Sequence, residues 1–404
     1  MTSRSPLRLS DLRGVSRLAL DASVGVTDLV EAMHHNISQA PSLLGTPAPG
    51  ATRGITGLVY RSIRGVTRLV GGGIDAVLAR ILPLLGEESS SPGREALLAA
   101  LNGVLGDHLA ASGNPLAISM RLRPEEAVPP TTGKLIVLAH GLCMNDLQWH
   151  RDGHDHGAEL ARDLGFTPLY LHYNSGLHIS TNGRALADLL ETLVRQWPVP
   201  VEELAILGHS MGGLVARGAC HYGSAAGHDW PRHLKKLIFL GTPHHGSPLE
   251  RGGNWIDFAL GVSPYTAPLA RLGKIRSAGI TDLRHGSLLD EDWEGRDRFE
   301  RSKGSNRRLL PLPLPLPDDV ECYAMAATKG RTAGGLGSPL PSDGFVPLDS
   351  ALGRHEDPGL SLSLPESRCW ILHGAHHFDL LSHPEAYGKI RQWLAAPGLG
   401  GSPR

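Results

Sequence analysis

The clearest chemical signal in the sequence is Ser210, which stands in GHSMGG at residues 208–213. An apolar run at 204–207 precedes this motif, and a helical pattern begins at Leu214. A serine on so sharp a turn between a strand and a helix has a strained, crowded backbone, which glycines two residues away on either side relieve. The pattern predicts a nucleophilic hydroxyl above the carboxyl edge of a sheet, where open α/β sheets bind ligands.

A serine hydroxyl becomes a strong nucleophile when a histidine takes its proton and a carboxylate orients that histidine. After a turn of this kind the acid follows the serine in the chain, and the histidine comes last. Asp343 fits the acid, because it lies in the loop sequence SDGFVP after an apolar run that ends near residue 327. Asp379 is a competitor, although it stands only two residues from the favoured histidine.

Two adjacent histidines, His376 and His377, are candidates for the base. They lie in HGAHHFDLL at residues 373–381, after an apolar run at 370–372. Periodicity does not separate them. The pattern His-x-Asp-Leu-Leu at 377–381, in which the two leucines start a helix, favours His377. A loop histidine here would reach Ser210 with one ring nitrogen and Asp343 with the other.

Two backbone N–H groups are candidates for binding the oxyanion that forms when a serine attacks an acyl carbon. Met211 offers its N–H at the positive end of the helix that follows the serine. Leu142 offers a second N–H in the loop after the apolar run at 135–139, where Gly141 lets the backbone approach the substrate. Cys143 is expected to be a bystander beside this loop.

The elements that position these residues alternate from about residue 115 between short apolar runs and helical patterns. Runs that are apolar on both faces are typical of parallel strands covered by helices on both sides, so we expect an α/β fold with a mostly parallel central sheet and flanking helices. The strands are expected at 116–122, 135–139, 169–172, 204–207, 237–240, 322–326 and 369–372, and the helices at 158–164, 185–197, 214–222 and 388–394.

The alternation lapses between about residues 247 and 319. Within this segment, LPLPLPLP at 310–317 excludes a helix or a central strand, because proline removes the backbone donor at alternate positions. We expect an extended stretch of polyproline type there, and we interpret 247–319 as a cap inserted between strands over the active site.

The residues before the sheet have a helical pattern, and we expect two parts in the chain. Residues 1–114 are predicted to form an N-terminal helical region, with an amphipathic hairpin and a third helix at about 94–109, and residues 115–396 a catalytic domain. Two interpretations of the hairpin stay open: it packs on the catalytic domain, or it lies on a membrane or lipid particle.

The composition of the 404-residue chain is that of an ordinary globular protein, with 41% hydrophobic residues and a formal net charge of −1. This balance does not indicate a nucleic-acid partner. The apolar stretch at 55–85 contains arginines and an aspartate that argue against a membrane span, and no secretory signal pattern opens the sequence. We expect a cytoplasmic protein, with peripheral membrane contact through the N-terminal helices as the alternative.

We expect no metal and no cofactor. The cysteines lie far apart without zinc-site spacing and are interpreted as buried or half-buried thiols, although sequence separation does not exclude a disulfide. Three clustered histidines lack an obvious carboxylate or thiolate partner and are interpreted as solvated residues at a helix start. The cysteines are Cys143, Cys220, Cys322 and Cys369, and the histidines are His150, His154 and His156.

Together these motifs resemble the bacterial lipase/esterase branch of the α/β-hydrolase superfamily, including members described as similar to the GPI inositol-deacylase. The matching sequences are HG at 140–141, GHSMGG at 208–213, GTPHHGS at 241–247, DGFVP at 343–347 and HFDLL at 377–381. The resemblance covers about residues 130–395. It implies an α/β-hydrolase fold with Ser210, Asp343 and His377 as the catalytic triad, and it says nothing about residues 1–115.

Other residues at the same edge of the sheet have expected supporting roles. In similar lipases the segment at 241–247 supports the active site without reacting, so His244 and His245 are expected to be structural or to line the pocket. The sequence YNSG at 173–176 also follows a predicted strand and is expected to line the pocket.

The expected activity is hydrolysis of a small lipophilic carboxylic ester through an acyl-enzyme. Acyl transfer or thioester cleavage would use the same triad and stays an alternative. A protein of another class, a catalytically idle protein on a lipid or granule surface, is the other alternative, because a fold alone does not establish an activity.

Overall fold

The computed structural model describes residues 10–11, 13–24, 61–62, 64–65, 92–124, 131–246, 277–294, 311–330 and 342–396. The chain forms two compact units. The smaller unit comprises Met1–Ser91 and Leu109–Ala117, and the larger unit comprises Pro92–His108 and Ile118–Arg404.

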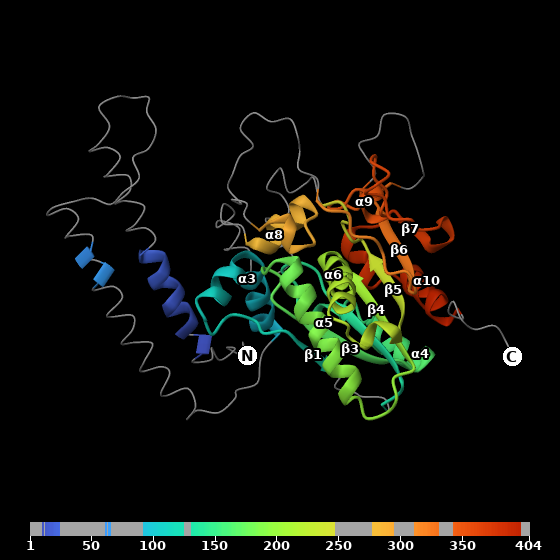
Figure 1. The fold of residues 1–404 in the computed structure, drawn as a ribbon, viewed down its shortest axis with the longest axis horizontal. Coiled ribbons are helices and arrows are strands. Elements are labelled where there is room, and N and C mark those ends of the chain that lie inside the picture. The colour runs from blue at the N-terminus through green and yellow to red at the C-terminus, as the bar shows by residue number, and fades with distance from the viewer. Residues whose placement is uncertain are drawn as a thin grey trace. The chain divides into compact units, whose positions relative to one another are not determined.

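A seven-stranded sheet forms the centre of the larger unit, in the order β1-β3-β2-β4-β5-β6-β7 (Figure 1). β1 pairs antiparallel with β3, and all the other neighbours are parallel. This arrangement confirms the expected mostly parallel sheet. The strands are β1 (Arg121–Pro124), β2 (Lys134–Ala139), β3 (Thr167–His172), β4 (Glu203–His209), β5 (Leu234–Leu240), β6 (Glu321–Thr328) and β7 (Cys369–His373).

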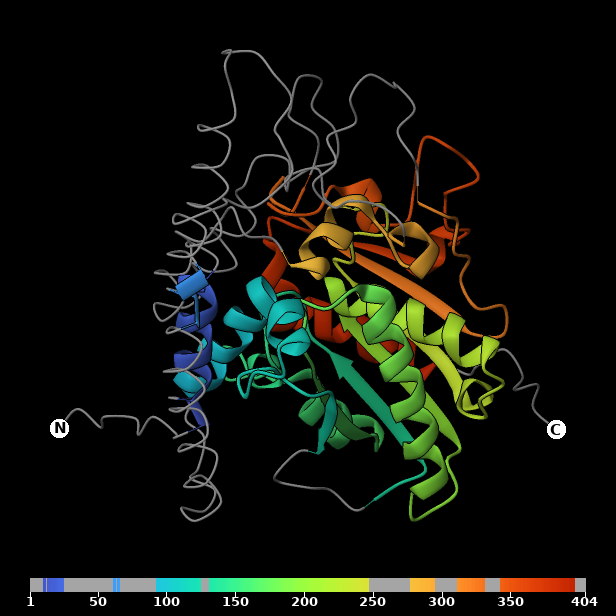
Figure 2. The same cartoon turned by 60° about the vertical axis from the view of Figure 1, so that its left-hand side comes forward.

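Helices cover both faces of this sheet, as Figures 1 and 2 show. On one face α5 packs against α6, and on the other α4 packs against α10. Strands between two helical layers are buried on both sides, and every residue of β3 is buried. The α-helices of the larger unit are α3 (Pro92–Ala111), α4 (His156–Leu164), α5 (Ile179–Gln196), α6 (Met211–Ala225), α8 (Ala278–His285), α9 (Leu348–Ala351) and α10 (Pro384–Ala395).

Short 3₁₀ turns lie between these elements. They are η2 (Asp146–Trp149), η3 (Trp230–His233), η6 (Asp290–Asp292), η7 (Glu366–Arg368) and η8 (His377–Leu381). Two of them lie beyond the carboxyl ends of strands. η2 comes after the loop that leaves β2, and η8 comes after the short loop that leaves β7. These turns therefore belong to the edge where the predicted nucleophile lies.

The boundary expected after residue 114 differs from the division of the structure. Most of α3 lies in the larger unit, where Glu95 pairs with Arg123 of β1 at 3.3 Å and the Asn174 amide donates to the Gly106 carbonyl oxygen at 2.9 Å. These long-range contacts join α3 to the sheet, and no periodicity in the sequence reports them.

The first expected strand is also displaced. A strand is expected at 116–122, but β1 begins only at Arg121. Asn114 explains the delay, since its side chain accepts a hydrogen bond from the Leu116 N–H and holds a turn instead. The other six expected strands each lie within an observed strand.

The described part of the smaller unit comprises a helical stretch in residues 10–24, short helical pieces at 61–65, and residues 109–117. Its arginine Arg17 donates to the Gly113 carbonyl oxygen at 2.8 Å, and Asn114 donates to that of Gly14 at 3.0 Å. Most of the expected N-terminal hairpin and much of the expected cap at 247–319 lie outside the described residues. Within the described ranges, every helix is too short or too polar to span a bilayer.

The crossing of α5 and α6 predicts an effect on stability. A Cβ on Gly183 of α5 would lie 2.9 Å from the backbone of Gly218 in α6. Gly183→Ala is therefore expected to lower the free energy of unfolding by about 1–3 kcal/mol through overpacking, as measured by urea denaturation. Gly388 of α10 has open space around it, so the control Gly388→Ala is expected to be about 1 kcal/mol more stable. Equal stability of the two variants would contradict this packing.

Candidate active site

Ser210 occupies the sharp turn between β4 and α6. Its backbone has φ 54° and ψ −123°, a conformation that residues with a side chain rarely adopt. A Cβ on Gly208 would lie 2.6 Å from the backbone of Gly213, and one on Gly212 would collide with the carbonyl oxygen of Ala139. The glycines around the serine are therefore required by close backbone packing, as the sequence pattern predicts.

The Ser210 side chain lies at the carboxyl edge of the sheet and is 1% exposed. Its backbone N–H donates to the Leu240 carbonyl oxygen at the end of β5, at 2.8 Å. Within the described residues the hydroxyl has no hydrogen-bond partner. The hydroxyl is thus buried without an internal acceptor to hold it in a fixed direction.

Asp343 and His377 meet in a buried pair. The Nδ1 of His377 lies 2.6 Å from the Oδ2 of Asp343, and both side chains are inaccessible to solvent. The other carboxylate oxygen accepts the N–H groups of Phe345 and Val346, each at 2.8 Å. With Oδ1 held in this way, the carboxylate has a fixed direction and accepts the Nδ1–H of the imidazole.

The competing candidates have other surroundings. His376 is exposed, and its backbone N–H donates to Asp379 Oδ2 at 2.7 Å. Asp379 therefore caps the start of η8. The geometry brings His377, not His376, to Asp343, so the structure favours the pair that the sequence motif favours.

Two buried histidines hold the turn that carries His377. The Nε2 of His209, next to the serine, lies 3.3 Å from the carbonyl oxygen of His377. The Nε2 of His156 lies 2.9 Å from the carbonyl oxygen of Leu380. A carbonyl oxygen only accepts, so both imidazoles donate. Burial lowers the pKa of His156 to about 3 and that of His209 well below its usual range, so both rings are neutral.

The interpretation of the histidine cluster as solvated is wrong for His156, which is fully buried. Since its Nε2 donates to Leu380, its Nδ1 must accept, and His154 donates to it with Nε2 at 2.7 Å. No periodic pattern indicates this role, because the contact with Leu380 joins residues more than two hundred positions apart. His209 had a signal, its place inside the serine motif.

The predicted oxyanion loop lies against the serine. A Cβ on Gly141 would be 3.1 Å from the Cβ of Ser210, so a side chain there would crowd the serine. Leu142 is buried in this loop, and Met211 is buried as the first residue of α6. Both expected donors therefore belong to backbone segments that flank Ser210 at the carboxyl ends of β2 and β4.

His244 makes structural contacts with side chains of α6 and β5. Its Nδ1 lies 3.3 Å from a guanidinium nitrogen of Arg217, and its ring packs edge-on against Phe239. Arg217 is buried on α6 and also donates to the Leu314 carbonyl oxygen, and burial lowers its pKa to about 10. Arg217 thus joins α6 to the proline-rich segment. The signal for it in the sequence is an arginine within the apolar helical pattern at 214–222.

His245 lies one residue further along the same loop and is held through its backbone. Its N–H donates to the Ser350 hydroxyl at 3.2 Å, and its ring packs edge-on against His355 at 4.9 Å. Burial lowers the pKa of His245 to about 4, so this ring is neutral. These contacts are structural, whereas a pocket-lining role for either histidine stays a prediction.

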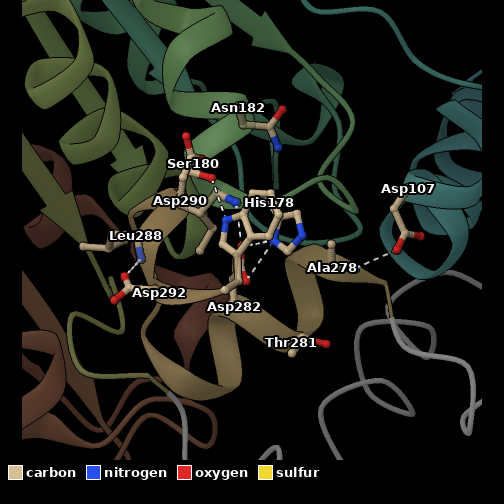
Figure 3. A network of polar contacts seen from close by, with 12 residues as sticks. Asp107, His178, Ser180, Asn182, Ala278, Thr281, Asp282, Leu288, Asp290 and Asp292 are labelled. Carbon is tan, nitrogen blue, oxygen red and sulfur yellow. Dashed lines mark hydrogen bonds and ion pairs between the residues drawn. The ribbon is translucent and has the colours of Figure 1, made fainter. Parts of the chain in front are cut away.

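The described part of the expected cap is anchored to the start of α5, as Figure 3 shows. The buried carboxylate of Asp282 in α8 accepts from His178 Nδ1 at 3.0 Å and from the Ile179 N–H at 2.9 Å. The ring of His178 stacks on Trp293 with centroids 3.8 Å apart. Burial raises the pKa of Asp282, while its two donors favour the charged form.

The backbone of the proline-rich segment is also bonded to a side chain of this region, Asp292. Asp292, which Figure 3 shows beside Leu288, accepts the N–H of Leu312 at 2.8 Å. Residues 311–317 form neither helix nor strand, as the alternating prolines predict. The segment is therefore fixed at two points, Leu312 through Asp292 and Leu314 through Arg217.

Within the described ranges, no cluster of three or more histidine, cysteine, aspartate or glutamate side chains has an arrangement that could hold a metal ion. All four cysteines are described, and none of them forms a disulfide. Burial raises the pKa of the Cys220 and Cys322 thiols, which keeps them protonated at neutral pH.

Residues 130–307 match the family model described as the PGAP1-like alpha/beta domain. No curated protein matches this chain in sequence. The family match and the order of the strands confirm the resemblance to the lipase/esterase branch that the motifs predict, and the larger unit has the α/β-hydrolase fold.

Several solved structures are similar to the chain at low identity. The mature Bacillus licheniformis lipase BlEst2 is 20% identical with a TM-score of 0.42, over 69% of this chain and 98% of that chain. Aspergillus fumigatus lipase B is 13% identical with a TM-score of 0.39, over 98% of this chain and 87% of that chain. The Pyrococcus furiosus esterase Pf2001 is 11% identical with a TM-score of 0.38, over 68% of this chain and 90% of that chain.

The neutral, buried state of His156 predicts a dependence of stability on pH. Its folded pKa of about 3 lies below the ordinary value of 6.5, so the unfolded chain binds the proton more tightly. The stability that this group contributes is complete above about pH 6.5 and is lost as the pH falls toward 3. His156→Gln keeps a donor for Leu380 and removes the titration.

Denaturant unfolding at pH 7.5 and 5.0 measures this effect. Between these pH values the wild type is expected to lose about 2 kcal/mol more stability than His156→Gln. The control is His150→Gln at an exposed neighbouring position, which is expected to keep the pH dependence of the wild type. The same pH dependence in wild type and His156→Gln would mean that His156 is not buried in its neutral form.

Proposed function

We propose that this protein is a serine hydrolase that cleaves carboxylic esters with a lipophilic acyl group. The observation that carries the proposal is the buried pair of Asp343 and His377, joined at 2.6 Å at the same edge of the sheet as the strained Ser210. A structural turn needs neither a buried imidazole–carboxylate pair nor a serine in this backbone conformation. The pair is what nucleophilic catalysis by a serine uses, and the strained turn is the one that presents the serine in α/β-hydrolases.

In the proposed reaction, Nε2 of His377 takes the proton of Ser210 while the serine oxygen bonds to the acyl carbon. The carbonyl oxygen becomes an oxyanion that accepts the N–H groups of Met211 and Leu142. The tetrahedral intermediate then collapses, and His377 gives its proton to the departing alcohol. A water molecule attacks the acyl-serine through the same base and releases the acid.

Asp343 has a positional and an electrostatic part in this proposal. Its carboxylate accepts the Nδ1–H of His377 and so fixes the tautomer in which Nε2 carries the lone pair. When His377 becomes positively charged, the neighbouring carboxylate stabilises that charge without becoming protonated. The two backbone donors on Oδ1 keep the carboxylate in place throughout.

A lipophilic acyl group is proposed from the side chains around the base. The ring of Phe345 lies 5.4 Å from the His377 ring, and that of Phe378 lies at the same distance, measured between centroids. Leu142 and Met144 are buried in the predicted oxyanion loop. Apolar side chains on both sides of the proposed reacting atoms favour an acyl chain that leaves water on binding.

The triad is tested by hydrolysis of aryl esters. Ser210→Ala and His377→Ala are each expected to lower kcat/KM by about 10³–10⁶-fold, because the members of a triad act as a unit, and Asp343→Asn by about 10³–10⁴-fold. His376→Ala is the matched control for the base and is expected to stay within about twofold of the wild type. Equal rates for wild type and Ser210→Ala would refute the proposed nucleophile.

The same assay on esters of increasing acyl length tests the substrate class. Each methylene group that is buried is expected to raise kcat/KM by about fourfold until the pocket is filled. Preference for acetate over all longer chains would contradict the lipophilic acyl group and leave the triad intact.

A further inference from the structure

The loop that follows β3 lies beside the predicted oxyanion loop. β2 and β3 are parallel neighbours, and Ala139 at the end of β2 pairs in register with Leu171. His140 and Tyr173 therefore leave the sheet at the same edge, next to each other. The sequence predicts a pocket-lining role for residues 173–176, but the hydroxyl groups of this loop make contacts to the backbone of the oxyanion loop.

Tyr173 holds the first peptide of that loop. Its hydroxyl donates to the His140 carbonyl oxygen at 2.8 Å, and its ring stacks on the His140 imidazole with centroids 4.3 Å apart. The side chain is 1% exposed, and burial raises the pKa of the phenol, so the hydroxyl stays protonated and remains a donor. One residue thus fixes both the backbone and the ring of His140.

The His140 ring in turn holds the second peptide. Its Nδ1 lies 2.9 Å from the Gly141 carbonyl oxygen, which also accepts the Met144 N–H at 3.3 Å. Burial lowers the pKa of His140 to about 4, so the ring is neutral and Nδ1 carries its proton toward this oxygen. In a trans peptide the C=O and the following N–H point in opposite directions, so holding the Gly141 oxygen sets the direction of the Leu142 N–H.

Ser175 holds the third peptide. The Cys143 N–H donates to the Ser175 hydroxyl oxygen at 3.0 Å. Cys143 has φ 58°, a left-handed conformation that a residue with a side chain keeps only when its surroundings impose it. With this N–H bonded to Ser175, the Leu142 N–H is a backbone donor of the loop without an acceptor among the described residues.

We propose that Tyr173 and Ser175 are positioning residues for the oxyanion site. Their hydroxyls fix the peptides on either side of the Gly141–Leu142 peptide, and the Tyr173 ring supports the imidazole that fixes this peptide itself. Neither hydroxyl touches the substrate. The inference rests on the proposed function, because it assigns the Leu142 N–H to the oxyanion that forms when Ser210 attacks an acyl carbon.

Two single-atom deletions test this assignment in the full-length protein. Tyr173→Phe removes the bond to His140 but keeps the ring stack, and Ser175→Ala removes the acceptor of the Cys143 N–H. Each variant is expected to lower kcat by about tenfold or more, since a misdirected oxyanion donor loses part of its effect, and to leave KM for an aryl ester within about twofold. Ser175→Thr keeps the hydroxyl oxygen and is expected to restore most of kcat.

A second readout separates this role from a general loss of structure. An alkyl trifluoromethyl ketone adds to the serine oxygen and presents an oxyanion, so its affinity is expected to fall by the same factor as kcat. The matched control is Tyr387→Phe, which removes the 2.7 Å bond between Tyr387 and Asp163. This control is expected to keep both kcat and the ketone affinity of the wild type.

The possible outcomes separate a failure of this inference from a failure of the proposed function. A wild type that neither hydrolyses aryl esters nor binds the ketone would overturn the proposed function. An active wild type whose Tyr173→Phe and Ser175→Ala variants keep kcat and ketone affinity within twofold would overturn the inference alone. A fall in kcat without a fall in ketone affinity would also overturn it, because the two hydroxyls would then act on another step.

Discussion

The close approach of three backbone segments around Ser210 is the constraint on which the rest of the site depends. β4 turns into α6 so sharply that a Cβ on Gly208 would lie 2.6 Å from the backbone of Gly213, and on the other side a Cβ on Gly141 would lie 3.1 Å from the Cβ of Ser210. Packing this dense brings the strained serine, the first turn of α6 and the predicted oxyanion loop into one small volume. The strain at Ser210 persists because its neighbours fix it from every direction.

Burial of polar groups is the second constraint on the site, and it explains why His140, His156 and His209 are neutral. A buried polar group without a partner costs about 1–3 kcal/mol, so His209 and His156 donate to carbonyl oxygens of η8, and His140 donates to Gly141. The same burial lowers the pKa of all three rings. Neutral imidazoles therefore brace the site without adding charge near the proposed base.

The sequence was sufficient for the features that local pattern encodes. Buried parallel strands appear as apolar runs, and the crowding around Ser210 appears as glycines at fixed spacing, so the sheet and the turn were both predictable. Contacts between distant segments leave no such pattern. The contact of His156 with η8, the brace at Tyr173 and the place of α3 in the larger unit depend on tertiary packing that no local period reports. The strand expected at 116–122 is displaced for the same reason, because the Asn114 side chain holds a turn there.

Covalent labelling with a fluorophosphonate tests the central claim most directly. The reagent bonds to a serine oxygen that a neighbouring base activates, and peptide mass spectrometry locates the adduct. Labelling of the wild type at Ser210 alone, and its loss in His377→Ala, is the predicted result. Labelling at another serine, or undiminished labelling of Ser210 in His377→Ala, would contradict the account.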